Sequence, residues 1–421
     1  MSFFFTLFYL IAEYMRPQQM YEALSDLPLA EIVIIGIIIS FVLEKRRLDN
    51  FNFQNILMLV FLFWFFISTL LAFKSEFAWQ GLINFSKWAI IYFLLINSIN
   101  ERKKFYIFLI LLLLLNFKYA QYAIRIWANR GFYSDPRGLY EGGGIGTSFF
   151  KNPNDFGIAL NSIFGLSFYM LLTDTRKIFN WFKMRWFYVI TTSSIPLAIL
   201  ATSSRGAALG LGGCFLGILY KSKKRVMAFL LVSIAAAIFL LLIPEDNWKR
   251  FQNMGTEEDK TGQERIKLLR AGIRMANEYP LTGVGPNNFV YVNKNIYHSD
   301  LHLVQHNIFI QAASELGYPG LFIFLMMIAG CFYNNIKTRR ILKEKGADDL
   351  FLYRLSDGLD ICLIGFIVNG FFITVLYYPF FWTLLVLNVA LSDIVKQLAE
   401  GVSNIKNSSS YAIGQCNYTH L

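Results

Sequence analysis

Charged residues are scarce in this chain of 421 residues: Asp, Glu, Lys and Arg make up 16% of it, whereas 55% is hydrophobic. That balance is too apolar for a soluble protein of this length. Apolar runs of about 17–22 residues recur along the sequence, and each is long enough to cross a bilayer as a helix. The short alternating segments of a membrane β-barrel are missing. We therefore expect an all-α polytopic membrane protein.

Cysteine is sparse as well. None of the four cysteines lies in an expected outer loop, so the sequence predicts no disulfides.

Acidic residues are fewer than basic ones, which gives a net charge of +11. We attribute this excess to membrane topology and expect no nucleic-acid partner. The first apolar segment lacks a basic flank and a small-residue cleavage site, so we expect it to be retained as a span.

The apolar runs predict about twelve transmembrane helices. The run at 305–335 is longer than one crossing needs, and we expect a partial helix there that Pro319 interrupts. The expected spans are 3–15, 27–43, 55–73, 81–98, 105–126, 155–173, 186–201, 203–220, 226–243, 305–335, 357–375 and 377–395.

Basic clusters such as 44–47, 101–104 and 221–225 fall on one side of this topology. The positive-inside rule then predicts that both termini are cytoplasmic and that the polar loops 127–154 and 244–304 face outward. The expected parts of the chain are an N-terminal transmembrane bundle at 1–243, the large outer loop with short helices at 244–304, C-terminal transmembrane helices at 305–395, and a disordered polar cytoplasmic tail at 396–421.

The large outer loop contains a helix-like run, "ERIKLLRAGIRMANEY" at 264–279, that Pro280 ends. At 100° per residue Arg265 falls on an apolar face, opposite a stripe of solvated cations. An arginine turned toward the protein needs an anionic partner, which is either a protein carboxylate or a ligand phosphate. The expected apolar face is Ile266, Leu269, Ile273 and Ala276, and the expected cationic stripe is Lys267, Arg270 and Arg274.

Arg205 stands in "ILATSSRGAALGLGG", between two spans at the outer end of a helical hairpin. Arginines near a membrane mark substrate paths or ion pairs, but an arginine that snorkels to the interface fits equally well. In the other outer loop, Asp155 is expected as a helix N-cap, and Asn154 and Asp155 could alternatively contact a polar substrate.

Three histidines, His298, His302 and His306, are spaced by four residues. On one continuous helix they would suggest a metal site, but the first two fall in a loop and no cysteine or carboxylate joins them, so we expect no metal. His306 stands at the start of an apolar run, in "VQHNIFIQAASELGYPG". A polar substrate at the membrane surface would reach it there.

Three separated segments together resemble the O-antigen ligase and polymerase superfamily, which includes bacterial protein O-oligosaccharyltransferases and exopolysaccharide polymerases. They are "SSRGAALGLG", "ERIKLLRAGIRMANEYPLTGVGPNNF" and "QHNIFIQAASELGYPGL", within roughly 190–335. The N-terminal "YMRPQQMYEALSDLPL" and "NPNDFGIAL" look like a subgroup linked to exopolysaccharide or glycosylation loci.

The resemblance implies a GT-C-like glycosyltransferase in the bacterial inner membrane. Such an enzyme takes a glycan from undecaprenyl diphosphate on the outer face and passes it to a lipid, protein or polysaccharide hydroxyl. It implies catalytic roles for Arg205, Arg265 and His306. Asn307 would contact substrate, whereas Glu315 would be structural first, since on a regular helix it lies opposite His306. No D-x-D motif stands in an outer loop, so we expect metal-independent, inverting transfer without a cofactor.

Two alternatives stay open. One is a transporter of a small anion, in which the arginines form the anion site, although the sequence shows no internal symmetry. The other is a scaffold of a polysaccharide assembly complex that carries out no chemistry.

Overall fold

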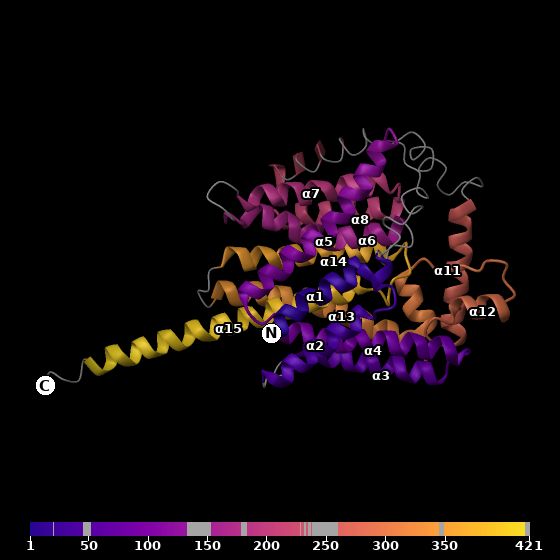
Figure 1. Ribbon diagram of the computed structural model, residues 1–421, viewed down its shortest axis with the longest axis horizontal. Coiled ribbons are helices and arrows are strands. Elements are labelled where there is room, and N and C mark those ends of the chain that lie inside the picture. The colour runs from indigo at the N-terminus through magenta and orange to yellow at the C-terminus, as the bar shows by residue number, and fades with distance from the viewer. Residues whose placement is uncertain are drawn as a thin grey trace.

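The computed structural model is an elongated bundle of helices (Figure 1). It describes residues 1–19, 21–44, 52–132, 153–177, 183–227, 260–344 and 349–416, with a few residues between 229 and 237. Within those residues every regular element is a helix. The helices are α1 (Ser2–Met15), α2 (Leu29–Leu43), α3 (Phe53–Leu70), α4 (Ser75–Ser98), α5 (Arg102–Asn129), α6 (Pro153–Thr173), α7 (Met184–Ala201), α8 (Arg205–Lys221), α11 (Lys260–Glu278), α12 (Phe289–Asn295), α13 (Ile308–Glu344), α14 (Leu350–Gly370) and α15 (Pro379–Cys416), with short 3-10 turns at Pro17–Gln19 and Glu22–Leu24.

Seven of the described helices are long and apolar enough to cross a membrane: α3, α4, α5, α6, α7, α13 and the Pro379–Gly401 part of α15. The prediction of an all-helical polytopic membrane protein is therefore confirmed. The total of about twelve spans stays a prediction, because α1 and α2 are shorter apolar helices and the expected span 226–243 lies mostly outside the described residues.

The long apolar run after residue 305 differs in detail from its prediction. Helix α13 begins at Ile308 and continues to Glu344, and the break inside it is at Gly317, with φ 73° and ψ 177°. Pro319 does not break the helix itself. It stands in the first turn of the section that resumes after Gly317, where the missing N–H of proline costs nothing.

The next two expected spans, 357–375 and 377–395, have different boundaries. Helix α14 ends at Gly370 and α15 begins at Pro379, so a loop at 371–378 separates them. Where the sequence predicts a disordered tail from 396, the backbone of α15 stays helical to Cys416. Extending a helix that packing has already nucleated adds one hydrogen bond for each residue fixed.

Helices α6, α8 and α14 pack closely because small residues line their contacts. A Cβ atom placed on Gly165 of α6 would lie 2.3 Å from the carbonyl oxygen of Gly358 in α14, and one on Gly210 of α8 would lie 1.8 Å from the side-chain amide nitrogen of Asn369 in α14. Only glycine lets the backbones approach this far, a recurrent feature of helix packing in membranes.

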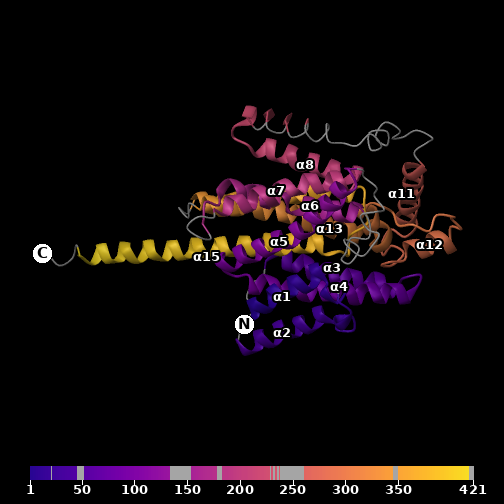
Figure 2. The same ribbon diagram turned by 45° about the horizontal axis from the view of Figure 1, so that its top comes forward.

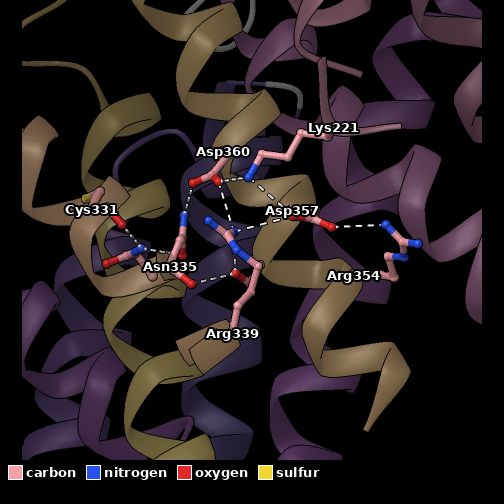
Figure 3. Close-up of polar contacts among 9 residues, drawn as sticks. Lys221, Cys331, Asn335, Arg339, Arg354, Asp357 and Asp360 are labelled. Carbon is pink, nitrogen blue, oxygen red and sulfur yellow. Dashed lines mark hydrogen bonds and ion pairs between the residues drawn. The ribbon is translucent and has the colours of Figure 1, made fainter. Parts of the chain in front are cut away.

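A buried ion network ties α8, α13 and α14 together in the N-terminal half of α14 (Figure 3). Lys221 at the end of α8 contacts both Asp357 and Asp360. Arg339 of α13 lies 2.9 Å from Asp360 Oδ2, and Arg354 lies 3.2 Å from Asp357 Oδ2. Both carboxylates are almost fully buried; Asp357 is shared by three cations and Asp360 by two. The network therefore holds these helices in register.

Helices α11 and α12 lie together at one end of the bundle, and both views show α15 running away from them (Figures 1 and 2). Helix α11 runs across the ends of the bundle helices. It packs on α13 through Gly272, where a Cβ atom would lie 2.4 Å from Ile310 Cγ2. The expected site residues of the outer loop are therefore presented at this end.

Candidate functional site

His306 precedes α13 and does not belong to it. Its backbone has φ 53°, a left-handed conformation that is unusual for a residue with a side chain. The His306 N–H donates a hydrogen bond to Thr374 Oγ1 at 2.8 Å. Asn307 then caps the helix, because its Oδ1 accepts from the backbone N–H groups of Phe309 at 2.9 Å and Ile310 at 3.0 Å. The structure therefore gives Asn307 a positioning task that was not expected from the sequence.

Arg265 lies on the face of α11 that turns toward the bundle. Its side chain is half-buried and its Nε atom is fully buried. Gly272, two turns later on the same face, meets Ile310 at the start of α13. Arg265 is therefore directed toward the segment that contains His306.

The remaining residues of α11 correct part of the predicted apolar face, in which Ala276 is buried as expected. Ile266 and Ile273 are 48% and 46% exposed, whereas Leu268 and Met275 are buried in a small core with α12. The helix is rotated relative to the orientation that its hydrophobic pattern predicts, because Gly272 packs against α13. Hydrophobic periodicity cannot predict this contact. The expected cationic stripe is exposed as predicted: Lys267, Arg270 and Arg274.

The electrostatics of His306 show that it is close to Arg265. The pKa of His306 is lowered from 6.5 to about 4, first because burial removes the imidazole from water and second because of the positive charge of Arg265. Both causes disfavour the protonated ring. The structure thus brings together a neutral imidazole and a guanidinium from segments 41 positions apart in the numbering.

Arg205 is the first residue of α8, after Ser203 with φ 53°. The Ser204 side chain caps the helix by accepting the Ala207 N–H at 3.1 Å, and its hydroxyl donates to Asn154 Oδ1. Asn154 therefore fixes the N-terminus of α8, next to Arg205. The helix dipole and the guanidinium both make this point favourable for an anion.

Asp155 differs from its prediction as an N-cap. Helix α6 begins at Pro153, so Asp155 is the third helical residue, and it is almost fully buried. A carboxylate in the first turn still interacts favourably with the helix dipole.

Glu315 is buried inside α13 and does not share a helix face with His306, because His306 precedes the helix. Its Oε2 accepts a hydrogen bond from the Tyr377 hydroxyl at 2.7 Å, and its backbone oxygen accepts from the Gly285 N–H at 3.0 Å. Glu315 thereby connects the 371–378 loop with the glycine turn of "LTGVGPNNF". This agrees with a structural role.

The 371–378 loop is the part of the site that the sequence did not reveal. Thr374 holds His306, while a Cβ atom on Gly206 would lie 2.9 Å from Phe372 Cβ. One loop therefore lies between the start of α8, with Arg205, and His306. Its sequence, "FFITVLYY", has the apolar character of a span, so only the proline and glycine at its ends could have indicated it.

The other residues considered from the sequence lie apart from this centre. His298 and His302 are exposed on the segment between α12 and α13. No group of three potential metal ligands forms among the described residues. The acidic cluster at 257–259 and most of the loop 127–154 fall outside the residues that the structure describes.

The fold and the site define a polytopic membrane protein with a neutral histidine and cationic side chains gathered at one end of its bundle. Residues 187–325 match the family described as O-antigen ligase, and this segment contains Arg205, Arg265 and His306. The match assigns the segment to the O-antigen ligase and polymerase superfamily, which confirms the resemblance read from the motifs. Residues 1–172 match a family of unknown function, DUF5935. No curated protein matches the chain.

Proposed function

We propose that this protein is a glycosyltransferase of the ligase and polymerase type, acting at the outer face of the bacterial inner membrane. The donor is a glycan on a polyprenyl diphosphate such as undecaprenyl diphosphate, and the acceptor is a hydroxyl of a lipid, a protein or a polysaccharide. The observation that carries this proposal is the pairing of Arg265 with a neutral His306, within the segment that matches the O-antigen ligase family.

The reaction is a single displacement without a metal ion. The acceptor oxygen attacks the anomeric carbon, the bond from that carbon to the diphosphate oxygen breaks, and the configuration inverts. Arg265 and Arg205 stabilise the negative charge that builds on the leaving diphosphate. The neutral ring of His306 takes the proton of the acceptor hydroxyl.

The low pKa of His306 fits this task once the donor is considered. An imidazole with a pKa of about 4 is a weak base. A diphosphate bound beside Arg265 brings negative charge, which counters the effect of the guanidinium and raises the pKa of His306. Donor binding would thus prepare the base for the acceptor.

The test is a transfer assay with purified protein, a polyprenyl-diphosphate glycan and a chelator. We expect His306→Ala to lower turnover by about 10²–10⁴-fold and Arg265→Ala by about 10²–10³-fold. His302→Ala and Arg270→Ala, which change exposed residues nearby, are the matched controls and should retain activity. Turnover untouched by both site substitutions would refute the assignment, and no turnover with any carrier would favour anion transport.

A further inference from the structure

A cavity of about 390 Å³ with polar and aromatic lining residues lies beside the candidate site, among α1, α2, α4 and the 371–378 loop. Tyr377 and Tyr378 of that loop line it, and Thr374 of the same loop binds His306. The pKa of Tyr378 is raised to about 12, first by burial and then by the nearby charge of Asp155. The cavity is therefore a neighbour of the site, and its volume is within the range of about 300–1,000 Å³ that ligand pockets occupy.

The charged groups of the cavity occur as matched pairs. Arg16 lies 3.5 Å from Glu13, and Lys87 lies 2.8 Å from Glu31. All four residues line the cavity, two with positive and two with negative side chains. A diphosphate would need an excess of positive charge, which this balanced set does not supply. The two cations donate hydrogen bonds and the two carboxylates accept them. Such a set suits a neutral ligand rich in hydroxyl groups, because each hydroxyl can both donate and accept.

Tyr9 provides an independent indication that the cavity takes a polar ligand. Its side chain is 2% exposed and lines the cavity, and its hydroxyl has no hydrogen-bond partner among the described residues. A buried polar atom without a partner is rare in folded proteins. Trp88, also in the lining, meets Tyr9 edge-on with ring centroids 6.5 Å apart. The cavity thus combines flat aromatic rings with an unsatisfied hydroxyl.

Arg16 belongs to "YMRPQQMYEALSDLPL", a segment to which the proposed transfer mechanism assigns no task. It ends α1 in a left-handed conformation, with φ 45° and ψ 63°. That conformation is unfavourable for a residue with a Cβ atom. The strained turn places Arg16 in the wall of the cavity beside Glu13.

We propose that this cavity binds one neutral sugar unit of a glycan substrate. The inference rests on the proposed function, and the two are tested separately. The Tyr9 hydroxyl, the two ion pairs and Asn84 would hydrogen-bond the sugar hydroxyls, and Trp88 would contact a face of the ring. The sugar belongs either to the glycan that is transferred or to the glycan that accepts it.

The first experiment measures binding without turnover. Full-length protein in nanodiscs is titrated with the methyl glycosides of glucose, galactose, mannose and N-acetylglucosamine, and with inorganic diphosphate, followed by saturation-transfer NMR. We expect one or more of the glycosides to bind and Tyr9→Phe to weaken that binding about three- to tenfold, the effect of one lost hydrogen bond. Asn84→Ala, at an exposed position on α4, should weaken it without affecting folding. Tyr21→Phe, at a tyrosine that is 61% exposed, is the matched control.

Binding of none of the glycosides, or equal binding by wild type and Tyr9→Phe, would overturn the proposal. Diphosphate that competes with the glycosides would overturn it too, since it would show an anion site. These results do not depend on catalysis, so they are distinct from a failure of the transfer assay.

Transfer kinetics then identify the source of the sugar. If the cavity holds the donor glycan, Tyr9→Phe raises the KM for the polyprenyl-linked glycan, and if it holds the acceptor, the KM for the acceptor rises. In either case kcat stays near the wild-type value, because Tyr9 lies outside the reacting centre. A loss confined to kcat would contradict a binding role.

Discussion

The protonation of His306 offers a direct test of the site's geometry, because its pKa of about 4 lies well below the ordinary value of 6.5. The chain has only four histidines, so protein labelled at histidine ring carbons gives few NMR signals, and His306→Gln identifies the one from His306. A pH titration of this signal in nanodiscs should have its midpoint near 4. A midpoint at 6.5 or above would refute the burial and the proximity to Arg265.

Two variants separate the causes of the low pKa. Arg265→Gln removes the positive charge but leaves the ring partly buried, so the pKa of His306 should rise without reaching 6.5. Arg270→Gln removes an exposed charge from the same helix and should leave the midpoint unchanged. Inorganic diphosphate should raise it in the wild type. An unchanged midpoint in Arg265→Gln would show that Arg265 does not act on His306.

The same pKa has a consequence for stability. The folded protein keeps His306 neutral down to about pH 4, whereas the unfolded chain binds a proton there from about pH 6.5 downward. Stability is therefore lost as the pH falls from about 6.5 to 4. The difference of about 2.5 in pKa corresponds to about 3 kcal/mol. In wild type relative to His306→Gln, this loss should appear as a steeper fall of the unfolding temperature over that interval.

Two further predictions concern stability in detergent, measured as thermal unfolding. Gly317→Ala should cost more than about 1 kcal/mol, because φ is 73° and the new Cβ would lie 2.1 Å from the Leu281 carbonyl oxygen; Gly212→Ala, in open space, is the control, and equal effects would contradict the reasoning. Asp360→Asn should cost about 3–5 kcal/mol by leaving buried cations with one carboxylate (Figure 3). Adding Lys221→Met to Asp360→Asn should recover part of that loss, because it removes one of the cations. If the double variant instead loses the sum of the two single losses, the network is contradicted.

The apolar runs were sufficient to predict helices and a membrane, because hydrocarbon accepts a chain segment only when its backbone is internally hydrogen-bonded. Periodicity also placed Arg265 on an inward face. It was right about Ala276, which is buried, but wrong about Ile266 and Ile273, which are exposed. The rotation of that helix comes from Gly272 against Ile310, a contact between distant segments that no local pattern encodes.

Polar pairing was equally hidden in the sequence. Thr374 stands 68 positions after His306, and Lys87 stands 56 positions after Glu31. The local sequence around each side chain does not indicate its partner, because the pair forms only when two distant helices or loops meet. The motif residues were identifiable because a family resemblance pointed to them, whereas the residues that position them were not.

The electrostatics of the proposed site imply an order of events. Before a donor binds, His306 is neutral but too weakly basic to take a proton from a hydroxyl efficiently. A donor diphosphate changes this by countering the guanidinium charge. The base then becomes effective only when a glycan is present to receive the attack. Such coupling predicts that the pKa governing kcat, which reports the donor-bound enzyme, lies above the pKa of His306 in the free protein. Equal values would mean that the diphosphate does not bind beside the Arg265 and His306 pair.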